Sequence, residues 1–154
     1  MPEYVTVSNE EEYKSAALLF IEYANWLGID LSFQNFEQEL QNLKTMYGPP
    51  KGTIILSRYN EEYVACIAVR SIDDTTAELK RMYVKPGFQR NGIGEKLLSL
   101  ALIFSQQKGY AKIRLDTLNT MIPAINLYKK NGFVEIPSYY FNPETTAVFF
   151  EKKL

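Results

Sequence analysis

The chain contains no histidine, which removes the commonest general base and the commonest transition-metal ligand at once. Catalytic pairs of serine or cysteine with histidine are therefore excluded. Cys66 is the single cysteine, so the chain can form neither an internal disulfide nor a zinc site built from histidine and cysteine. We expect no metal site, and acid-base chemistry has to come from carboxylates, tyrosines or lysines.

An excess of charge of one sign and long apolar runs are also missing. The formal net charge is −1 at pH 7 and the charged residues are interspersed, which argues against a nucleic-acid partner or an anionic membrane surface. No apolar run approaches the roughly 20 residues that span a bilayer, and the first residues lack the basic, apolar pattern of a secretory signal. Cys66 lies in the strand-like run 64–69, where we expect a buried, reduced thiol. These features predict a cytoplasmic protein with no membrane partner.

The length of the chain suits one domain. Its 154 residues can bury roughly two-thirds of the unfolded surface without disulfides. The sequence contains no internal repeat, low-complexity tract or flexible linker that would divide it. We therefore expect residues 1–154 to form a single domain.

Hydrophobic periodicity predicts a mixture of strands and helices. Strands are expected at 4–7, 53–58, 63–72, 77–84, 112–117, 133–136 and 146–152. Helices are expected at 10–27 and 35–43, from residue 92 to a stop at Gly109, and before Gly132. Ser8 and Glu11, at capping-box spacing, mark the start of the first helix. The strand-helix-strand order after Ala77 suggests that the strands at Ala77 and Lys112 pair in parallel through a right-handed crossover.

The most informative segment is Gln89-Arg90-Asn91-Gly92-Ile93-Gly94, which follows a strand ending at Val84 and opens a helix. The first turn of a helix carries amide hydrogens without helical acceptors, together with partial positive charge, so it attracts anions. Glycines 92 and 94 carry no Cβ, which lets phosphate oxygens approach the backbone, and Arg90 adds a guanidinium. The segment is therefore a candidate pyrophosphate site.

Two better-known phosphate loops do not fit this segment. A Walker-type loop ends in Gly-Lys-Ser/Thr, whereas Glu95 follows Gly94 here. A dinucleotide-binding loop needs a third glycine where this chain has Leu97. Taken alone, the hexapeptide is equally compatible with a plain loop that glycines cap.

Four segments in order form a more specific pattern: Ala77–Val84, the loop at 89–94, Arg114–Thr117 and Leu127–Phe133. This pattern resembles the acetyl-coenzyme A-binding core of the GNAT superfamily of N-acetyltransferases. The resemblance implies a mixed α/β fold in one domain, with a mostly antiparallel central sheet and helices on both faces. It also implies that the parallel strands at Ala77 and Lys112 splay apart.

The resemblance implies acetyl-coenzyme A as the acyl donor and assigns its binding to the splayed strand and the loop. The residues at matching positions are Met82, Tyr83, Val84, Gln89, Arg90, Asn91, Gly92, Ile93 and Gly94. A main-chain amide near Met82 is expected to face the thioester carbonyl as an oxyanion donor. One position departs from the family: Met121 stands where many members have an asparagine that assists cofactor binding.

Glu78 is the candidate general base. It lies six residues before Val84, where several family members have a glutamate that accepts the amine proton directly or through water. An alkylamine with a pKa of about 10.4 is almost fully protonated at pH 7, and a base helps to relieve this penalty of ~4–5 kcal/mol. The alternative is a solvated or salt-bridged strand glutamate, because other members rely on water chains or backbone carbonyls.

Tyr128 is the candidate general acid. Its matching position in the family points a phenol at the cofactor sulfur, and proton transfer from tyrosine to the thiolate is uphill by only ~2 kcal/mol. The alternative is a packed aromatic, because Ala124 and Tyr128 share a helical face.

The resemblance thus implies an N-acetyltransferase that transfers an acetyl group to a primary amine of a small molecule, amino acid or peptide. Direct attack in a ternary complex is the expected mechanism. One alternative is an enzyme that transfers another acyl group or acylates a hydroxyl. The alternative from another class is a non-catalytic acyl-coenzyme A sensor or interaction module. The protein is expected to be a monomer or a homodimer. Candidate walls for the acceptor cleft are Tyr23, Trp26, Phe33, Tyr139 and Tyr140.

Overall fold

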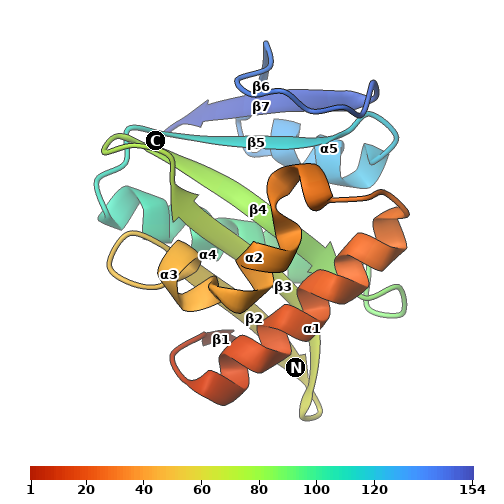
Figure 1. Ribbon diagram of the computed structural model, residues 1–154. Helices are drawn as coiled ribbons and strands as arrows, with labels where there is room; N and C mark the ends of the chain where they lie inside the picture. Colours follow the sequence, from red (N-terminus) through yellow and green to blue (C-terminus); the bar gives the residue numbers. More distant parts are fainter.

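The computed structural model describes residues 1–154 as one seven-stranded sheet with helices on both faces (Figure 1). The strand order across the sheet is β1-β2-β3-β4-β5-β7-β6. The strands are β1 (Glu3–Thr6), β2 (Thr53–Tyr59), β3 (Glu62–Ser71), β4 (Thr76–Val84), β5 (Lys112–Leu118), β6 (Val134–Ile136) and β7 (Ala147–Lys153). The helices are α1 (Glu10–Leu27), the 3-10 turn η1 (Ser32–Gln34), α2 (Phe36–Gln41), α3 (Leu43–Tyr47), α4 (Ile93–Gln107) and α5 (Ile122–Lys130).

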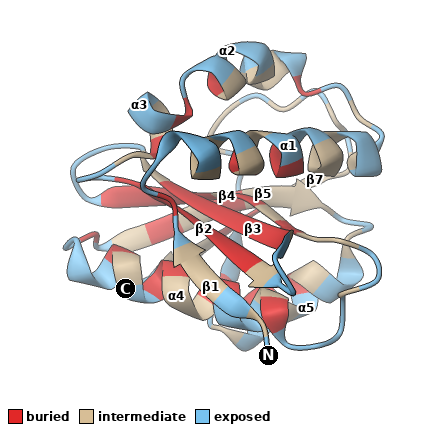
Figure 2. Ribbon diagram, turned by 90° about the horizontal axis from the view of Figure 1, so that it is seen from below, coloured by how far each residue is buried: buried red, intermediate tan, exposed pale blue.

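Two hydrophobic layers hold the helices to the sheet (Figure 2). On one face, α4 and α5 pack their apolar sides, including Leu97, Leu98 and Ala101, on β3, β4 and β5. On the other face, α1 and α3 pack on β2 and β3 through residues such as Phe20 and Tyr47. The centre of β3 is buried on both sides, as its continuous apolar run requires. The buried, free Cys66 lies in this run, as predicted.

The parallel pair of β4 and β5 splays apart, as the family resemblance implies. The two strands pair only from Thr76 to Glu78, opposite Lys112 to Arg114. All other strand pairs in the sheet are antiparallel. Beyond Glu78 the second half of β4 has no partner on the β5 side, and this gap holds the candidate site.

Two local predictions were wrong. The cap of α1 is Asn9, whose side chain accepts from the Glu12 amide at 2.9 Å, while the Glu12 carboxylate accepts from the Ser8 amide at 2.8 Å. The capping box is therefore shifted by one residue from Ser8 and Glu11. The helix expected at 35–43 is two short helices, α2 and α3, that meet at Asn42, preceded by a 3-10 turn. Asn35 adopts a left-handed conformation and Asn42 a non-helical one, and asparagine tolerates both.

Candidate functional site

A β-bulge interrupts β4 beside the splay. Lys80 pairs with Ala68 and Tyr83 pairs with Cys66, so Arg81 and Met82 on β4 oppose only Ile67 on β3. Arg81 takes the left-handed backbone conformation, with φ at 60°. A bulge bends its strand and redirects the following backbone groups. It therefore changes the direction of the Met82 main chain within the open half of β4.

A buried ion pair stabilises the bulge. The Arg81 guanidinium donates from Nε and Nη2 to the two oxygens of Glu39 at 2.9 and 2.8 Å, and both side chains are buried. Phe36 lies against the same guanidinium, and the Arg81 carbonyl accepts from the Cys66 thiol. Burial lowers the pKa of Arg81, but the Glu39 carboxylate more than offsets this and keeps the arginine charged. Helix α2 thus fixes the strained residue of β4.

The loop before α4 presents free amides. Arg90 and Gly92 both have left-handed backbone angles, with φ of 66° and 77°. Gly92 is the N-cap of α4 and offers no side-chain oxygen to the helix. The first α-helical bond runs from the Lys96 amide to the Gly92 carbonyl at 3.0 Å, so the preceding amides are available to a ligand. At Gly92 it is the positive φ rather than a lack of space that favours glycine.

A groove of about 260 Å³ joins this loop to the open half of β4 and to the start of α5. Its lining includes most of the predicted cofactor residues: Met82, Tyr83, Val84, Gln89, Arg90, Gly92 and Gly94. Asn91 and Ile93 do not line it. Asn91 is exposed and directs its side-chain amide to the Phe88 carbonyl, whereas Ile93 packs its side chain into the core. Met121, at the N-cap of α5, lines the same groove, which we call the coenzyme groove.

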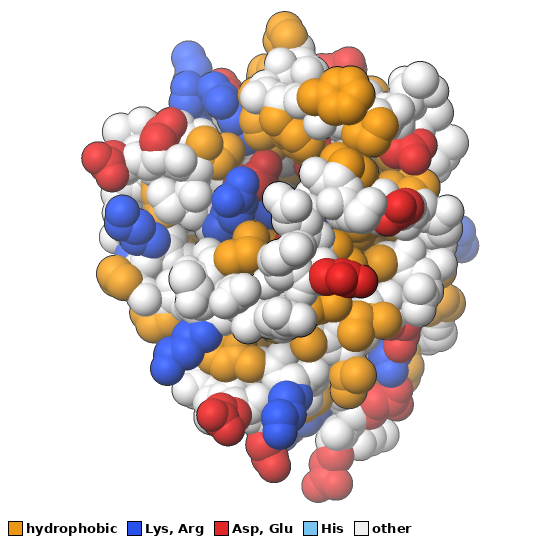
Figure 3. All heavy atoms as spheres, viewed as in Figure 1, with side chains coloured by type: hydrophobic (Ala, Val, Ile, Leu, Met, Phe, Trp, Pro, Cys, Tyr) orange, Lys and Arg blue, Asp and Glu red, His pale blue; other side chains and the backbone are white.

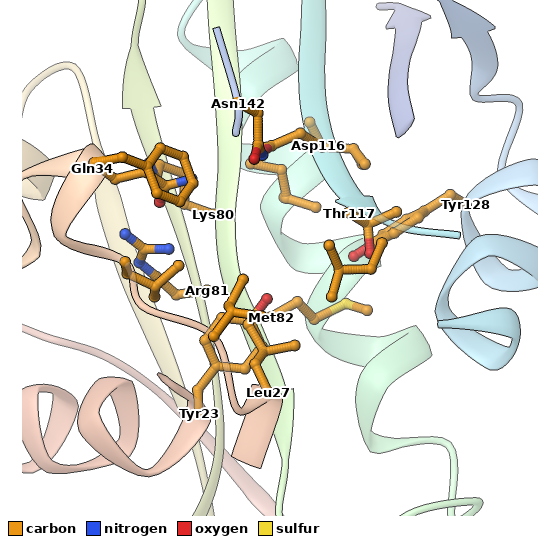
Figure 4. Close-up of a pocket in the computed structure, with 16 residues that line it drawn as sticks. Tyr23, Leu27, Gln34, Lys80, Arg81, Met82, Asp116, Thr117, Tyr128 and Asn142 are labelled. Atoms are coloured by element: carbon orange, nitrogen blue, oxygen red, sulfur yellow. The ribbon is translucent and has the colours of Figure 1, made fainter. Parts of the chain in front are cut away.

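A second, narrow cavity of about 50 Å³ lies between β4 and β5, and Figure 4 shows its lining. Met82 borders both this inner cavity and the coenzyme groove. Tyr128 reaches into the inner cavity from α5, while its ring packs against Phe133 and Phe150. Burial raises the pKa of Tyr128, and the nearby Tyr23 and Asp116 raise it further. The phenol therefore remains protonated at neutral pH, as a proton donor must.

Glu78 lies in a third cavity, of about 300 Å³, which we call the outer cavity. Its carboxylate accepts from Arg70 Nε at 2.8 Å and from the Tyr139 hydroxyl at 2.7 Å. Burial alone would raise the pKa of Glu78, but Lys80, Arg70 and the Tyr139 hydrogen bond together lower it. Glu78 is therefore an ionised carboxylate, and it does not share a cavity with Tyr128.

Lys80 and Gln34 border both the inner and the outer cavity, so the two are neighbours along β4. The order along this strand is thus Glu78 at the outer cavity, Lys80 between the two cavities, and Met82 at the coenzyme groove. In the view of Figure 1, the upper part of the surface has a hollow where basic (blue) and acidic (red) side chains lie among hydrophobic ones (orange; Figure 3).

The inner cavity is also lined by three polar residues that the motif comparison did not single out, namely Asp116, Gln34 and Asn142. Asp116 lines the inner cavity from β5, and its Oδ2 accepts from the Tyr140 hydroxyl and from Asn142 Nδ2. Gln34 reaches the same cavity from η1. Asp116 belongs to the quoted strand pattern, but only the splay shows that it faces a cavity. Gln34 and Asn142 lie in segments without a motif.

The aromatic residues expected to line the acceptor cleft are distributed over the three cavities. Tyr23 and Phe33 line the inner cavity, Trp26 lines the coenzyme groove, and Tyr139 and Tyr140 line the outer cavity. Burial raises the pKa of Tyr23 to about 12. Aromatic walls and a few charged groups are typical of small-molecule sites.

The described structure contains no group of three or more Cys, Asp and Glu side chains placed to hold a metal ion. None of its helices combines the length and apolar character that crossing a bilayer demands.

Comparisons with known proteins identify the family of the chain. The model of the acetyltransferase (GNAT) family matches residues 18–133. An uncharacterized N-acetyltransferase of Schizosaccharomyces pombe is 37% identical over 136 residues, which cover 86% of this chain and 82% of the relative. An acetyltransferase structure from Streptococcus agalactiae has a TM-score of 0.81 and 26% identity, with 99% of this chain and 98% of the other covered.

A GNAT acetyltransferase from Elizabethkingia anophelis with acetyl-CoA bound has a TM-score of 0.68 at 22% identity. The match covers 99% of this chain and 98% of that one, and it supports the fold. The family model spans the splayed strands, the loop, helices α4 and α5, and the part of α1 that borders the coenzyme groove. The chain therefore belongs to the GNAT family of acetyltransferases.

Proposed function

We propose that the protein is an acetyl-coenzyme A-dependent N-acetyltransferase that acts on a primary amine by direct attack in a ternary complex. The observation that carries this proposal is that the three cavities adjoin one another along β4, with Tyr128 in the inner cavity, which shares Met82 with the coenzyme groove. A donor in the groove and an acceptor in the inner cavity would meet at Met82. Acetyl-CoA bound to a structural neighbour supports the donor.

In this proposal the loop at 89–94 and the first turn of α4 bind the diphosphate of the coenzyme. The amides before Lys96 offer hydrogen bonds, and the helix dipole adds partial positive charge. Arg90 is exposed at the rim of the groove and adds a charge-assisted contact. Asn91 and Ile93 contribute through their backbone. The open main chain of Met82, Tyr83 and Val84 binds the pantetheine amides as an added strand would.

The reaction joins a neutral amine to the thioester carbonyl. The amine nitrogen forms a bond to the carbonyl carbon, and the main-chain amide of Met82 stabilises the resulting oxyanion. Cleavage of the carbon–sulfur bond then releases the thiolate, which takes a proton from Tyr128. The amine gives up its extra proton to Glu78 through water, and solvent returns that proton to Tyr128. The products are an N-acetylamide and free coenzyme A.

The lowered pKa of Glu78 sets the strength of this base. Glu78 stays ionised at neutral pH and is ready to accept a proton, but it holds that proton weakly. A water relay suits its position, because Glu78 lies in the outer cavity, apart from Tyr128. Monomeric or homodimeric states are both compatible with this site, which one chain completes.

The direct test is release of free thiol when the purified protein is mixed with acetyl-coenzyme A and a panel of primary amines. We expect amine-dependent release together with a product heavier than the amine by one acetyl group. Coenzyme binding without release for every amine would instead support a non-catalytic acyl-coenzyme A sensor.

A further inference from the structure

Three charged side chains line the inner cavity, and two of them, Lys80 and Asp116, form no ion pair within the protein. Lys80 donates only to Gln34 Oε1, at 3.4 Å. Asp116 accepts from two neutral groups, the Tyr140 hydroxyl and the Asn142 amide. Neither residue takes part in any of the nine ion pairs of the structure. The site therefore holds a cation and an anion that remain open to a ligand.

Neutral side chains keep these two charges apart. Gln34 Oε1 accepts a hydrogen bond from the Lys80 ammonium, and Gln34 Nε2 donates one to the Tyr140 hydroxyl at 2.9 Å. Tyr140 in turn donates to Asp116. The chain of contacts is thus ammonium, amide, phenol and carboxylate, with both ends facing the cavities. A ligand that is positive at one end and negative at the other matches this arrangement.

Lys80 is held at an energetic cost. Burial lowers the pKa of its ammonium, and Arg81 lowers it further, while Glu78 and Glu39 act in the opposite direction. A desolvated charge without a close counter-charge is unfavourable, and a bound anion relieves that penalty. Lys80 is therefore the group in the site with most to gain from an anionic ligand.

The outer cavity also has an excess of positive charge. Arg70 and Lys80 are its cations and Glu78 is its one carboxylate, which Arg70 and Tyr139 already bind. At about 300 Å³ the cavity is much larger than the inner one, so it can accept the body of an acceptor. An anionic group placed there lies beside Lys80.

The orientation of the ligand follows from the order of the cavities. The inner cavity borders the coenzyme groove at Met82 and contains Tyr128, so the reacting nitrogen belongs at this end. Asp116 lines the same inner cavity from β5 and can accept hydrogen bonds from the nitrogen. The opposite end of the ligand then lies toward Lys80, which borders both the inner and the outer cavity.

Resting on the proposed acetylation of an amine, we infer that the acceptor carries a carboxylate close to its amine, as amino acids and short peptides do. Asp116 binds the amine end of the acceptor and Lys80 binds its carboxylate. Gln34 and Tyr140 hold the two charged residues in place.

The test measures binding by calorimetry on the whole protein saturated with coenzyme A, so it does not require turnover. The ligands are three matched sets: leucine, phenylalanine and glycyl-leucine, each beside its methyl ester and the amine that lacks the carboxylate. We expect the acid of at least one set to bind about tenfold or more tightly than its ester and its plain amine, a ratio equal to ~1.4 kcal/mol. Equal binding within every set, or no binding of any acid, would overturn the inference.

Variants of Lys80 test whether this residue causes the preference for the acid over its ester. Lys80→Met should reduce binding of the acid to the level of its ester and leave the ester unchanged, while Lys80→Arg should restore part of the difference. Lys51→Met is the matched control, because its side chain is 69% exposed and lies outside the site. An acid-to-ester ratio that survives in Lys80→Met would contradict the role of Lys80, and thermal unfolding of each variant checks that the fold is intact.

The same ligands separate this inference from the proposed function. Tight binding of an acid without thiol release would support binding of the amine and the carboxylate by Asp116 and Lys80, and it would reject the acetyltransferase proposal. Thiol release with plain amines and esters as fast as with acids would retain the enzyme and reject the carboxylate-bearing acceptor.

Discussion

The coenzyme groove and the acceptor cavities are built in different ways. The groove is lined by α1, by the contiguous segment from Met82 to Glu95 and by the start of α5, and its candidate contacts are mainly backbone groups. The acceptor cavities bring together β3, β4, β5, η1 and the segment 139–142, and their contacts are side chains. Backbone contacts tolerate many changes of sequence, whereas single replacements can alter a charged side-chain site. Under the proposed function, the first region binds one donor while the second determines the acceptor.

The buried pair of Arg81 and Glu39 supports both regions, because Arg81 forms the bulge at their junction. Glu39→Ala leaves the Arg81 guanidinium buried without its partner and should lower the free energy of unfolding by ~3–5 kcal/mol. Urea unfolding measures this. Glu3→Ala is the control, since the pair of Glu3 and Arg58 is largely exposed and should contribute far less to stability. Similar losses for both variants would show that the pair does not stabilise the bulge.

Tyr128 tests whether the two regions meet at a catalytic group. Tyr128→Phe retains the packing on Phe133 and Phe150 and removes only the hydroxyl, so turnover should fall by about a hundredfold. The affinity for acetyl-coenzyme A should stay the same. Steady-state thiol release measures both. Tyr110→Phe is the control, because the Tyr110 hydroxyl bonds the Lys51 carbonyl away from the site, and unchanged turnover in Tyr128→Phe would reject the acid role.

Glu78 tests the acceptor region alone. Glu78→Gln removes the proposed base and should lower turnover by about tenfold, near the low end for acid-base catalysis because the lowered pKa makes this carboxylate a weak base. Coenzyme binding should not change, because Glu78 does not line the groove. A variant that kept its full rate from acidic to alkaline pH would remove Glu78 from the mechanism.

The smallest expected effect is on stability at low pH. The folded state lowers the pKa of Glu78 below its ordinary 4.5, so the ionised carboxylate stabilises the fold above about that pH. This contribution is lost as the pH falls through the lowered value. Wild type should therefore exceed Glu78→Gln in stability at pH 7, and the difference should narrow on acidification toward pH 3. A difference that is constant with pH would contradict the shift.

The fold and the coenzyme groove could be predicted because each depends on local patterns. Strand β4, the loop at 89–94 and the helix it opens follow one another along the chain, and their glycines and apolar spacing can be read from the sequence. The splay of β4 from β5 followed only from the family resemblance. The position of the first helix cap was missed by one residue, since Ser8, Asn9 and Glu12 share the capping contacts.

The acceptor site could be predicted only in part. Glu78 and the aromatic walls follow from the resemblance, but its ion pair with Arg70 and its hydrogen bond from Tyr139 join distant segments. The chain from Lys80 through Gln34 and Tyr140 to Asp116 connects four separate elements. Their proximity depends on the bulge and the splay, which no local pattern specifies.

The central claim is that the diphosphate of the coenzyme binds the first turn of α4. Calorimetry with coenzyme A compares wild type, the Arg90→Ala/Gly92→Ala variant, and a Lys108→Ala/Gly109→Ala variant at the other end of the helix. The control is matched, because Gly92 and Gly109 both have positive φ and open surroundings. We expect saturable binding to wild type, and an affinity about tenfold or more weaker in the first variant, which corresponds to ~1.4 kcal/mol. The affinity of the second variant should equal that of wild type. No heat with wild type, or equal affinity for all three proteins, would contradict it.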